Sequence, residues 1–456
     1  MDNIRLLIDF GSTFTKVVAV DLDRDEIVAI ARVPSTVDTD ITIGLEQAFK
    51  EIGSSVKITE TNRRKALACS SAAGGLRMVC VGFVPELTSE AATRAALGAG
   101  AKIVGRFSYE LSRQEVEEIE SISPDILLLA GGTDGGNEKV IVHNAKMLAG
   151  SDHAVKNFVV AGNKSAQDEI KIALRDFGDR VYFTRNVMPE IGVFDAEPCN
   201  KKIRDIFINH IIQAKGIAKA KAMIDDVIMP TPSAGLEAAK LIANGCEGAS
   251  GFGELLVVDV GGATTNVYSI ASGKPSGGAV VLDHLPEPFV KRTVEGDIGL
   301  KYNIATLEEL CRARERPQNF DRTIKNLYGG KLPVGEEEII CHDLLSRVAV
   351  DTAVTRHVGR LEVVYGPSGQ VLVQHGKDLT QVKTLIGTGG GIVFSANQGY
   401  VLQGALSQAG NDAILKPKAP KLLLDECYIL FAVGLLSQVE PVRALSLIKK
   451  QLKLIQ

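Results

Sequence analysis

The chain is patterned as short apolar runs that alternate with longer segments of helical character. The apolar runs are rich in branched residues and several end in glycine, which predicts buried strands. These runs span residues 6–10, 125–132, 156–162, 180–184 and 255–262. The segments predicted to be helices span 138–149, 164–176 and 201–225. Strands that alternate with helices predict an α/β fold in which helices cover a mostly parallel sheet.

One pattern occurs twice. Residues 6–30 and 255–280 each contain an apolar strand, an aspartate, a turn of glycine and hydroxyl residues, and two further strands. Each copy predicts a β-hairpin whose turn contains Asp, Gly and Thr. Two such units about 250 residues apart indicate two related lobes, each presenting one turn to a shared cleft.

The first turn has the composition of a phosphate site. Its polar and glycine residues are Asp9, Gly11, Ser12, Thr13, Thr15 and Lys16. Glycine lets backbone N–H groups approach an anion, hydroxyls add donors, and lysine adds a compact positive charge. Asp9 would repel a phosphate unless a cation lay between them, which predicts that Asp9 holds Mg²⁺ through water. Taken alone, an ordinary surface turn is the alternative.

The second turn repeats this chemistry with Asp259, Gly261, Gly262, Thr264 and Thr265. Two acids, two glycine–hydroxyl turns and one lysine in a single cleft predict a site for a magnesium–nucleoside triphosphate. Asp9 and Asp259 are therefore the candidate metal-holding and catalytic residues, and the glycines and hydroxyl residues of both turns are the candidate phosphate ligands.

A third glycine segment, 384–394, follows an apolar run and contains Gly387, Gly389, Gly390 and Gly391. It lies too late in the chain for a dinucleotide-binding fingerprint, and the sequence contains no GxxxxGK[ST] motif. After two phosphate turns, it is best interpreted as the surface against which a purine and ribose pack.

Composition excludes several classes of protein. The 456 residues are enough for two to four domains, and the net charge of −4 gives no case for nucleic acid or membrane surfaces as partners. The seven cysteines form no CxxC pair, which predicts reduced thiols and no structural zinc. The late apolar run 428–436 is far too short to span a membrane, and an acid at Asp2 argues against a signal peptide. A soluble, cytoplasmic protein is expected.

These segments resemble the actin-like ATPase superfamily, which includes sugar kinases and heat-shock-type chaperone ATPases. Its five signatures occur here in order: a phosphate hairpin at 6–18, a connecting helix at 229–243, a second hairpin at 255–268, an adenosine motif at 384–394 and a second connecting helix at 425–436. Ala432 and Gly434 are small residues suited to a close helix crossing. The resemblance implies two ribonuclease-H-like lobes with a nucleotide cleft between them, and ATP and Mg²⁺ as cofactors.

The resemblance also suggests how the chain is divided. Residues 1–124 would form the first part of lobe I, 125–225 an inserted α/β subdomain, 226–250 the connecting helix of lobe I, 251–424 lobe II, and 425–456 the C-terminal helices that return to lobe I.

One departure concerns catalysis. Where many chaperone-type members carry a catalytic glutamate, this sequence has Thr231 before Pro232. Threonine is a poor general base, so either Asp259 or another acid orients the water, or hydrolysis is slow. Glu295 and Asp297, in the turn 294–300, are candidates, with an acidic surface turn as the alternative.

At a finer level the chain resembles the MutL-type accessory proteins of adenosylcobalamin-dependent glutamate mutase. The stretches that carry this likeness are 6–16, 125–137, 257–269, 293–300 and 385–395. The resemblance implies a slow ATPase that reactivates a cobalamin-dependent mutase by promoting exchange of damaged cofactor. A small-molecule kinase and a filament-forming actin-like protein are the alternatives, and self-association is left open.

The glycine-rich stretch 125–137 is the most distinctive segment outside the phosphate turns. It either contacts a nucleotide or only permits a tight strand-to-helix turn, and both interpretations stay open.

Overall fold

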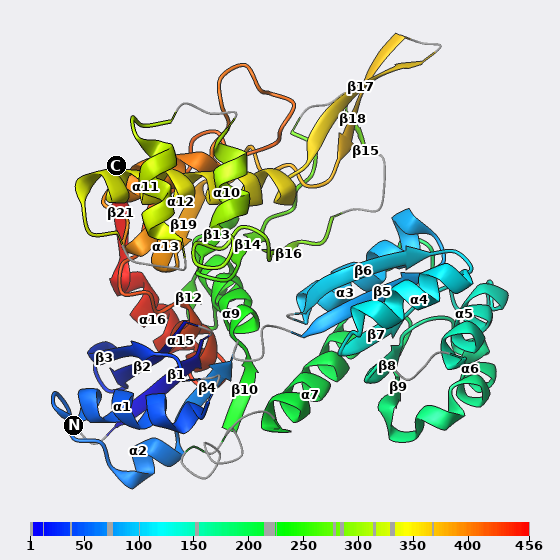
Figure 1. Cartoon of the computed structure of the whole chain (residues 1–456), viewed down its shortest axis with the longest axis horizontal. Helices are drawn as coiled ribbons and strands as arrows, with labels where there is room; N and C mark the ends of the chain where they lie inside the picture. The colour runs from blue at the N-terminus through cyan, green and yellow to red at the C-terminus, as the bar shows by residue number, and fades with distance from the viewer. Residues whose placement is uncertain are drawn as a thin grey trace. The chain divides into compact units, whose positions relative to one another are not determined.

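The computed structural model describes the chain except for residues 1–2, 12, 37–38, 71–75, 100, 151–154, 214–223, 225, 277–279, 283–286, 313–315, 329–332, 367–368 and 456. The chain forms two compact units. The first combines Met1–Ala72 with Ala214–Gln456, and the second is Ala73–Gln213. The second unit is the cyan-to-green part of Figure 1.

The N-terminal lobe of the first unit is built on a five-stranded sheet. Its strands, in the order β10-β4-β1-β2-β3, are β10 (Asp226–Pro230), β4 (Leu67–Ser70), β1 (Ile4–Phe10), β2 (Phe14–Asp21) and β3 (Glu26–Pro34). β1, β2 and β3 are antiparallel neighbours, whereas β1, β4 and β10 run parallel. The helices α1 (Ile41–Gly53) and α2 (Glu60–Arg64) connect β3 to β4.

The second lobe is built on a six-stranded sheet in the order β16-β14-β13-β19-β20-β21. Its strands are β16 (Val290–Glu295), β14 (Thr265–Ile270), β13 (Leu255–Val260), β19 (Thr384–Thr388), β20 (Lys421–Asp425) and β21 (Leu452–Ile455). Its helices are α10 (Ile304–Cys311), α11 (Phe320–Leu327), α12 (Glu336–His357), α13 (Gly390–Val393), α14 (Gln398–Leu402) and the short η4 (Gln403–Ala405). A separate three-stranded sheet, β15 (Val280–Leu282), β18 (Gly369–His375) and β17 (Arg360–Gly366), extends from this lobe (Figure 1).

The two lobes share one arrangement of strands. In each, a central strand pairs antiparallel with the next strand of its hairpin on one side and parallel with a later strand on the other. A third strand extends the hairpin side, and a further parallel strand extends the opposite side. The predicted fold class, α/β with two related lobes, is confirmed by this shared arrangement.

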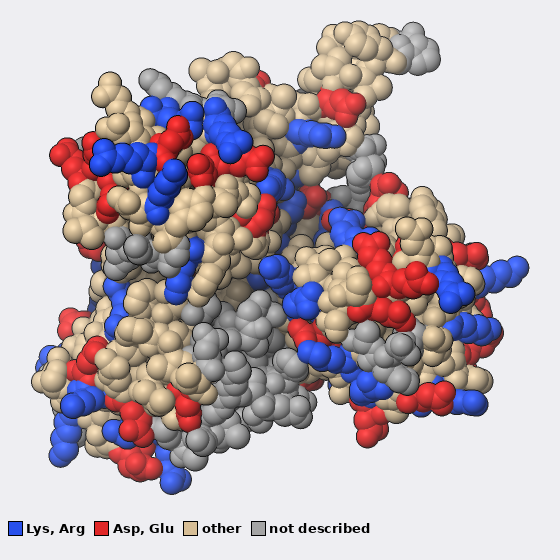
Figure 2. All heavy atoms as spheres, in the orientation of Figure 1, with Lys and Arg blue, Asp and Glu red and all other residues tan. Residues whose placement is uncertain are grey.

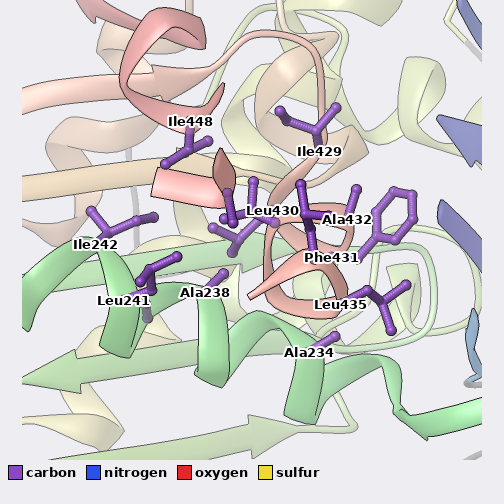
Figure 3. Packing of buried hydrophobic residues seen from close by; sticks show 14 of the residues in the cluster. Ala234, Ala238, Leu241, Ile242, Ile429, Leu430, Phe431, Ala432, Leu435 and Ile448 are labelled. Carbon is purple, nitrogen blue, oxygen red and sulfur yellow. The ribbon is translucent and has the colours of Figure 1, made fainter. Parts of the chain in front are cut away.

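Two helices join the lobes through a common core. They are α9 (Thr231–Asn244) and α15 (Leu430–Leu436), and α16 (Pro441–Gln451) packs beside them. Figure 3 shows the apolar side chains of α9 and α15 pointing toward one another. The same buried cluster contains Leu7 and Val18 from the first lobe and Val257 and Tyr268 from the second, so it belongs to both lobes. The short strands β11 (Gly245–Cys246) and β12 (Ala249–Ser250) follow α9.

The second unit contains one parallel sheet in the order β6-β5-β7-β8-β9. Its strands are β5 (Arg77–Gly82), β6 (Lys102–Ser108), β7 (Ile126–Leu129), β8 (Asn157–Val160) and β9 (Val181–Phe183). Its helices are η1 (Pro85–Ser89), α3 (Glu90–Gly98), α4 (Arg113–Ile122), α5 (Lys139–Ala149), η2 (Lys164–Ala166), α6 (Gln167–Ala173), η3 (Arg175–Arg180) and α7 (Glu197–Gln213). The unit starts at Ala73, whereas the sequence pattern suggested residue 125. The helix expected over 201–225 begins at Glu197, and most of its second half lies outside the described residues.

Acidic and basic residues are nearly balanced in number. The sequence has 51 basic and 55 acidic residues, and on the face drawn in Figure 2 the two kinds of side chain are interspersed. Within the described part of the chain, no helix is both long and apolar enough to cross a membrane.

Candidate functional site

The two predicted hairpins form, and their turns lie next to each other. Asp9 is opposite Lys16 in the first hairpin, and Asp259 is opposite Asn266 in the second. The same hydrogen bond closes both turns, from Gly11 N to Phe14 O in one and from Gly261 N to Thr264 O in the other.

The contact between the turns is close. A Cβ atom built on Gly262 would lie 3.0 Å from the hydroxyl oxygen of Thr13 and 3.2 Å from Lys301. The structure therefore brings together the two turns that the sequence places about 250 residues apart.

Asp9 is fully buried, and both of its carboxylate oxygens have partners. Lys16 Nζ lies 3.0 Å from Oδ2, and the Thr231 hydroxyl donates to Oδ1 at 2.6 Å. The thiol of Cys69 is 3.7 Å from Oδ1, a weak contact. A buried carboxylate needs such partners because removing an unpaired charge from water costs on the order of several kcal/mol, even after the surrounding protein has relaxed. Thr231, at the position of the expected glutamate, thus orients Asp9.

Lys16 is held from two sides. Its ammonium nitrogen pairs with Asp9 and lies 3.8 Å from the ring centroid of Tyr428. Burial by itself would lower the pKa of Lys16, but Tyr428 and Asp9 together hold this pKa above its usual range. Lys16 therefore carries a full positive charge between the two lobes.

Asp259 differs from Asp9 in that one of its oxygens is buried without a partner. Among the described residues, none forms a hydrogen bond with its Oδ1. Burial raises the pKa of Asp259 to about 6; Asp9 and Asp425 also raise it, while Lys16 and Arg292 act in the opposite direction. The carboxylate therefore has unmet acceptor capacity, although Oδ1 itself lies against the backbone near Gly389.

The third glycine segment packs directly on the second hairpin. Gly389 has a φ of +87°, and a Cβ atom there would overlap the Asp259 carboxylate and the backbone of Val260. Gly391 is packed against Val260 and Leu300, and Gly387 against Leu402. At Gly390 a Cβ atom would meet only the ring of Phe394, at 3.6 Å. Packing thus explains three of the four glycines, and a purine-binding role for the segment stays a prediction.

The hydroxyl residues of the turns divide into two groups. Thr15 and Thr265 are buried, and Thr265 donates to the carbonyl of Ile298 at 2.8 Å. Thr13 lies at the meeting point of the turns, and its buried hydroxyl finds no partner among the described residues. Thr264 accepts from the amide of Asn266 at 3.4 Å. Ser12 lies outside the described residues. Thr13 and Thr264 are the hydroxyls that the turns themselves present.

Two residues of the site were missed by the sequence pattern. Asp425 is buried at the end of β20, where it accepts from the Thr388 hydroxyl at 2.8 Å and from two backbone N–H groups at the start of α15. Tyr428 follows in a left-handed backbone conformation with φ of +55°. The sequence signal available for Asp425 was an apolar strand with an aspartate at or near its end. The strands that carry Asp9 and Asp259 show the same pattern.

The acids of the turn 294–300 are already paired. Arg356 of α12 donates to Glu295 at 2.6 Å and to Asp297 at 2.9 Å. Burial raises the pKa of Glu295 despite this bond. Their pairing favours a structural role for both acids over the orientation of a water molecule.

The donor set fits a hydrated magnesium ion. No cluster of three or more His, Cys, Asp or Glu side chains with metal-binding geometry occurs among the described residues. Asp9 is engaged with Lys16 and Thr231, so it would hold an ion through water, while Asp259 offers an unpartnered oxygen. Two carboxylates with few direct ligands match Mg²⁺, which retains most of its hydration shell.

Comparison with known proteins gives a family and one full-length relative. The model of the family described as MutL protein matches residues 5–452. The chain is 45% identical to Protein MutL of Clostridium tetanomorphum over 457 residues, which cover 98% of both sequences.

Two solved structures align over nearly the whole chain at low identity. The activator of the 2-hydroxyisocaproyl-CoA dehydratase from Clostridium difficile with bound ADPNP is 10% identical, with a TM-score of 0.29 and coverage of 98% of this chain and 96% of that one. Xylulose kinase from Rhodospirillum rubrum is 12% identical, with a TM-score of 0.33 and coverage of 99% and 93%. At these TM-scores we draw no conclusion about function from the alignments.

Proposed function

This chain belongs to the MutL protein family, and from that premise we propose that it is an ATP-binding accessory protein that acts on a partner enzyme. The observation that supports this proposal best is the meeting of the two turns. A buried, charged lysine and two carboxylates lie there, and one of the carboxylate oxygens has no hydrogen-bond partner among the described residues. Glycine turns that expose backbone N–H groups beside a lysine suit a polyphosphate.

In this proposal the chain's own residues divide the work of binding. Lys16 and the backbone of the two turns hold phosphate oxygens, with Thr13 and Thr264 as hydroxyl donors. Asp9 and Asp259 would hold Mg²⁺, and the ion when bound would neutralise charge on the phosphates. The segment 387–391 carries the adenosine.

Slow hydrolysis is part of the proposal. Thr231, where a glutamate was expected, donates to Asp9 and so orients a carboxylate rather than accepting a proton from water. Glu295 and Asp297 are bound to Arg356. Asp259 is the remaining acid of the set, with one oxygen that no described residue occupies, and in this proposal it would orient the water. Low turnover suits a protein whose task is to change state on a partner.

The finer proposal concerns the partner. From the resemblance to MutL-type accessory proteins, we infer that the partner is an adenosylcobalamin-dependent mutase, most simply glutamate mutase, in the cytoplasm. Closure of the lobes on ATP and their relaxation after hydrolysis would allow the protein to bind the mutase differently in the two states. Damaged cobalamin would leave during that cycle and intact cofactor would enter.

A reactivation assay tests this function. Glutamate mutase is inactivated by turnover and then supplied with the full-length protein, ATP, Mg²⁺ and fresh adenosylcobalamin. Recovery of mutase activity that requires all four additions is expected, and it should be lost in Asp259→Ala. The matched control is Asp412→Ala, because the side chain of Asp412 is 85% exposed. This variant should behave as wild type.

The other outcomes favour the alternatives. ATP consumption that depends on an added sugar or organic acid, without mutase recovery, would identify a kinase. Sedimentation of the protein upon ATP addition would identify a filament former. Either result would contradict the proposed function.

A further inference from the structure

Lys16 lies between the starts of two helices that cross each other. Thr231 is the first residue of α9, and its hydroxyl binds Asp9, the ion-pair partner of Lys16. Tyr428 lies two residues before α15, and its ring faces the Lys16 ammonium at 3.8 Å. The lysine of the first phosphate turn is therefore in contact with both connecting helices, directly or through one side chain.

The two helices are also joined to each other. A Cβ atom on Gly434 of α15 would overlap the carbonyl of Ala234 in α9. The contacts therefore form a continuous series. Lys16 pairs with Asp9, and Asp9 accepts a hydrogen bond from Thr231 at the start of α9. Helix α9 packs on α15, and Tyr428, just before α15, contacts Lys16. A displacement of Lys16 consequently changes contacts at the beginning of both helices.

The second lobe reaches the same point. Asp259 is covered by the backbone of Gly389, and the preceding Thr388 donates to Asp425. Asp425 in turn accepts from the backbone N–H groups of Ile429 and Leu430, where α15 begins. The acid of the second turn and the lysine of the first are thus both connected to the first turn of α15.

We propose that Tyr428 is a positioning residue that couples the place of Lys16 in the phosphate site to the position of α15. The inference rests on the proposed ATP binding. A phosphate attracts the lysine ammonium and competes for it with Asp9 and with the tyrosine ring. The left-handed backbone of Tyr428 is uncommon for a large side chain and needs its surrounding contacts, so a change at the ring is passed to α15.

Arg32 provides a second anchor for the same segment. Its guanidinium donates to the carbonyl of Cys427 at 2.7 Å and lies 5.8 Å from the Tyr428 ring. The backbone just before Tyr428 is therefore fixed to β3 of the first lobe, while the ring responds to Lys16. Because the segment is fixed on its N-terminal side, a shift of the ring is passed on toward α15, which begins two residues later.

The test is fluorine NMR of the full-length protein labelled with 3-fluorotyrosine. The chain has eight tyrosines, and the spectrum of Tyr428→Phe assigns the resonance of Tyr428. A non-hydrolysable ATP analogue with Mg²⁺ is titrated in, while calorimetry measures its binding in parallel. The Tyr428 resonance should move in proportion to occupancy. That of Tyr365, on β17 and 81% exposed, should stay in place as the matched control.

Variants separate positioning from packing. Tyr428→Phe keeps the ring over Lys16 and should bind the nucleotide within about two- to three-fold of wild type. Tyr428→Leu removes the ring that competes with phosphate and should bind about 2- to 30-fold more tightly, the range spanned by cation–π contacts. In Lys16→Arg the Tyr428 resonance should already be shifted without nucleotide.

The outcomes are distinguishable. Nucleotide binding by calorimetry with an unmoved Tyr428 resonance would overturn the coupling and leave the proposed function intact. Unchanged affinity in a folded Tyr428→Leu would overturn it as well. Absence of nucleotide binding would remove both proposals. If Tyr428→Leu does not fold, the shift of the Tyr428 resonance in wild type and in Lys16→Arg tests the proposal instead.

Discussion

Gly434 of α15 and Ala234 of α9 are packed so closely that no side chain fits between the two helices. A Cβ atom on the glycine would coincide with the carbonyl group of Ala234. The crossing brings the helices of both lobes into one core, which includes strands of the two sheets. The lobes are therefore held together by a contact that only glycine permits.

Substitution of this glycine should be costly. Gly434→Ala forces the helices apart, and overpacking of a core typically costs about 1–3 kcal/mol in the free energy of unfolding. Gly53→Ala, at the end of α1, is the matched control because a Cβ atom there meets nothing within 4 Å. Chemical denaturation measures both. Equal stability of the two variants would contradict the close crossing.

The protonation of Asp259 should make stability depend on pH. A free aspartate titrates near 4, whereas burial raises the pKa of Asp259 to about 6. The folded protein thus binds a proton that the unfolded chain has lost, and its free energy of unfolding should decrease as pH rises from about 4 to 6. The full penalty, present above pH 6, is about 3 kcal/mol at most, since one pKa unit corresponds to about 1.4 kcal/mol.

The variant Asp259→Asn isolates this effect. It should increase the free energy of unfolding at pH 7.5 and flatten its decrease between pH 4 and 6, measured by denaturant titration without nucleotide. Under the proposed function, the same variant should also weaken binding of ATP with Mg²⁺, because the Asp259 carboxylate would hold the ion. In wild type, that binding should weaken below pH 6. A variant less stable than wild type at pH 7.5 would contradict the prediction that the buried Asp259 charge destabilises the folded protein.

The bond from Thr231 to Asp9 should contribute measurably to stability. A hydrogen bond to a charged group contributes about 1.5–3 kcal/mol, so Thr231→Val should lower the free energy of unfolding by that amount. Thr231→Ser keeps the hydroxyl and should lose much less. Similar losses in the two variants would show that the methyl contact, rather than the 2.6 Å hydrogen bond, is what matters.

Loss of Lys16 should be more severe than loss of a surface cation. Lys16→Met leaves Asp9 buried and unpaired by its lysine, which typically costs about 3–5 kcal/mol. Adding Asp9→Asn should restore part of the stability, and thermal unfolding of the single and double variants measures the interaction. Arg113→Met, which breaks an exposed pair with Glu117, should cost about 1 kcal/mol or less. Additive losses at Lys16 and Asp9 would contradict the ion pair.

The hairpins could be predicted because their signal is local. An apolar strand that ends in aspartate and enters a glycine turn specifies both the strand and its antiparallel partner, so the facing of Asp9 and Lys16 follows from the hairpin register. The strand β4 carries no such signal, because four residues of moderate hydrophobicity resemble many loops. Its place between β1 and β10 depends on pairing with residues far away in the sequence.

The start of the inserted unit illustrates the same limit. β5 and β6 lie before residue 125, but β5 pairs in parallel with both β6 and β7, so both strands belong to the second unit. Pairing between strands separated by whole helices has no local signature. The sequence pattern therefore located the glycine-rich segment of this unit but not its first strands.

At the site, the sequence indicated the acids and the lysine but not what holds them. The segment 425–436 resembles one continuous helix, whereas α15 begins at Leu430 and Asp425 ends a strand. Tyr428 has a left-handed backbone, and its ring contacts Lys16 and Arg32, which come from β2 and β3 of the first lobe. Such a residue can be identified only when the tertiary structure is known.

The position of the inserted unit has a consequence for how the protein folds. β4 and β10 are neighbouring parallel strands, yet Ser70 and its register partner Pro230 are about 160 residues apart. Closing so long a loop is entropically unfavourable while the intervening chain is disordered, and it becomes easier once that chain has collapsed into a compact body. The second unit should accordingly acquire its structure first, and the edge of the N-terminal sheet should be completed late, after the ribosome has released β10. Interrupted synthesis would then yield a folded insertion attached to an unfinished lobe.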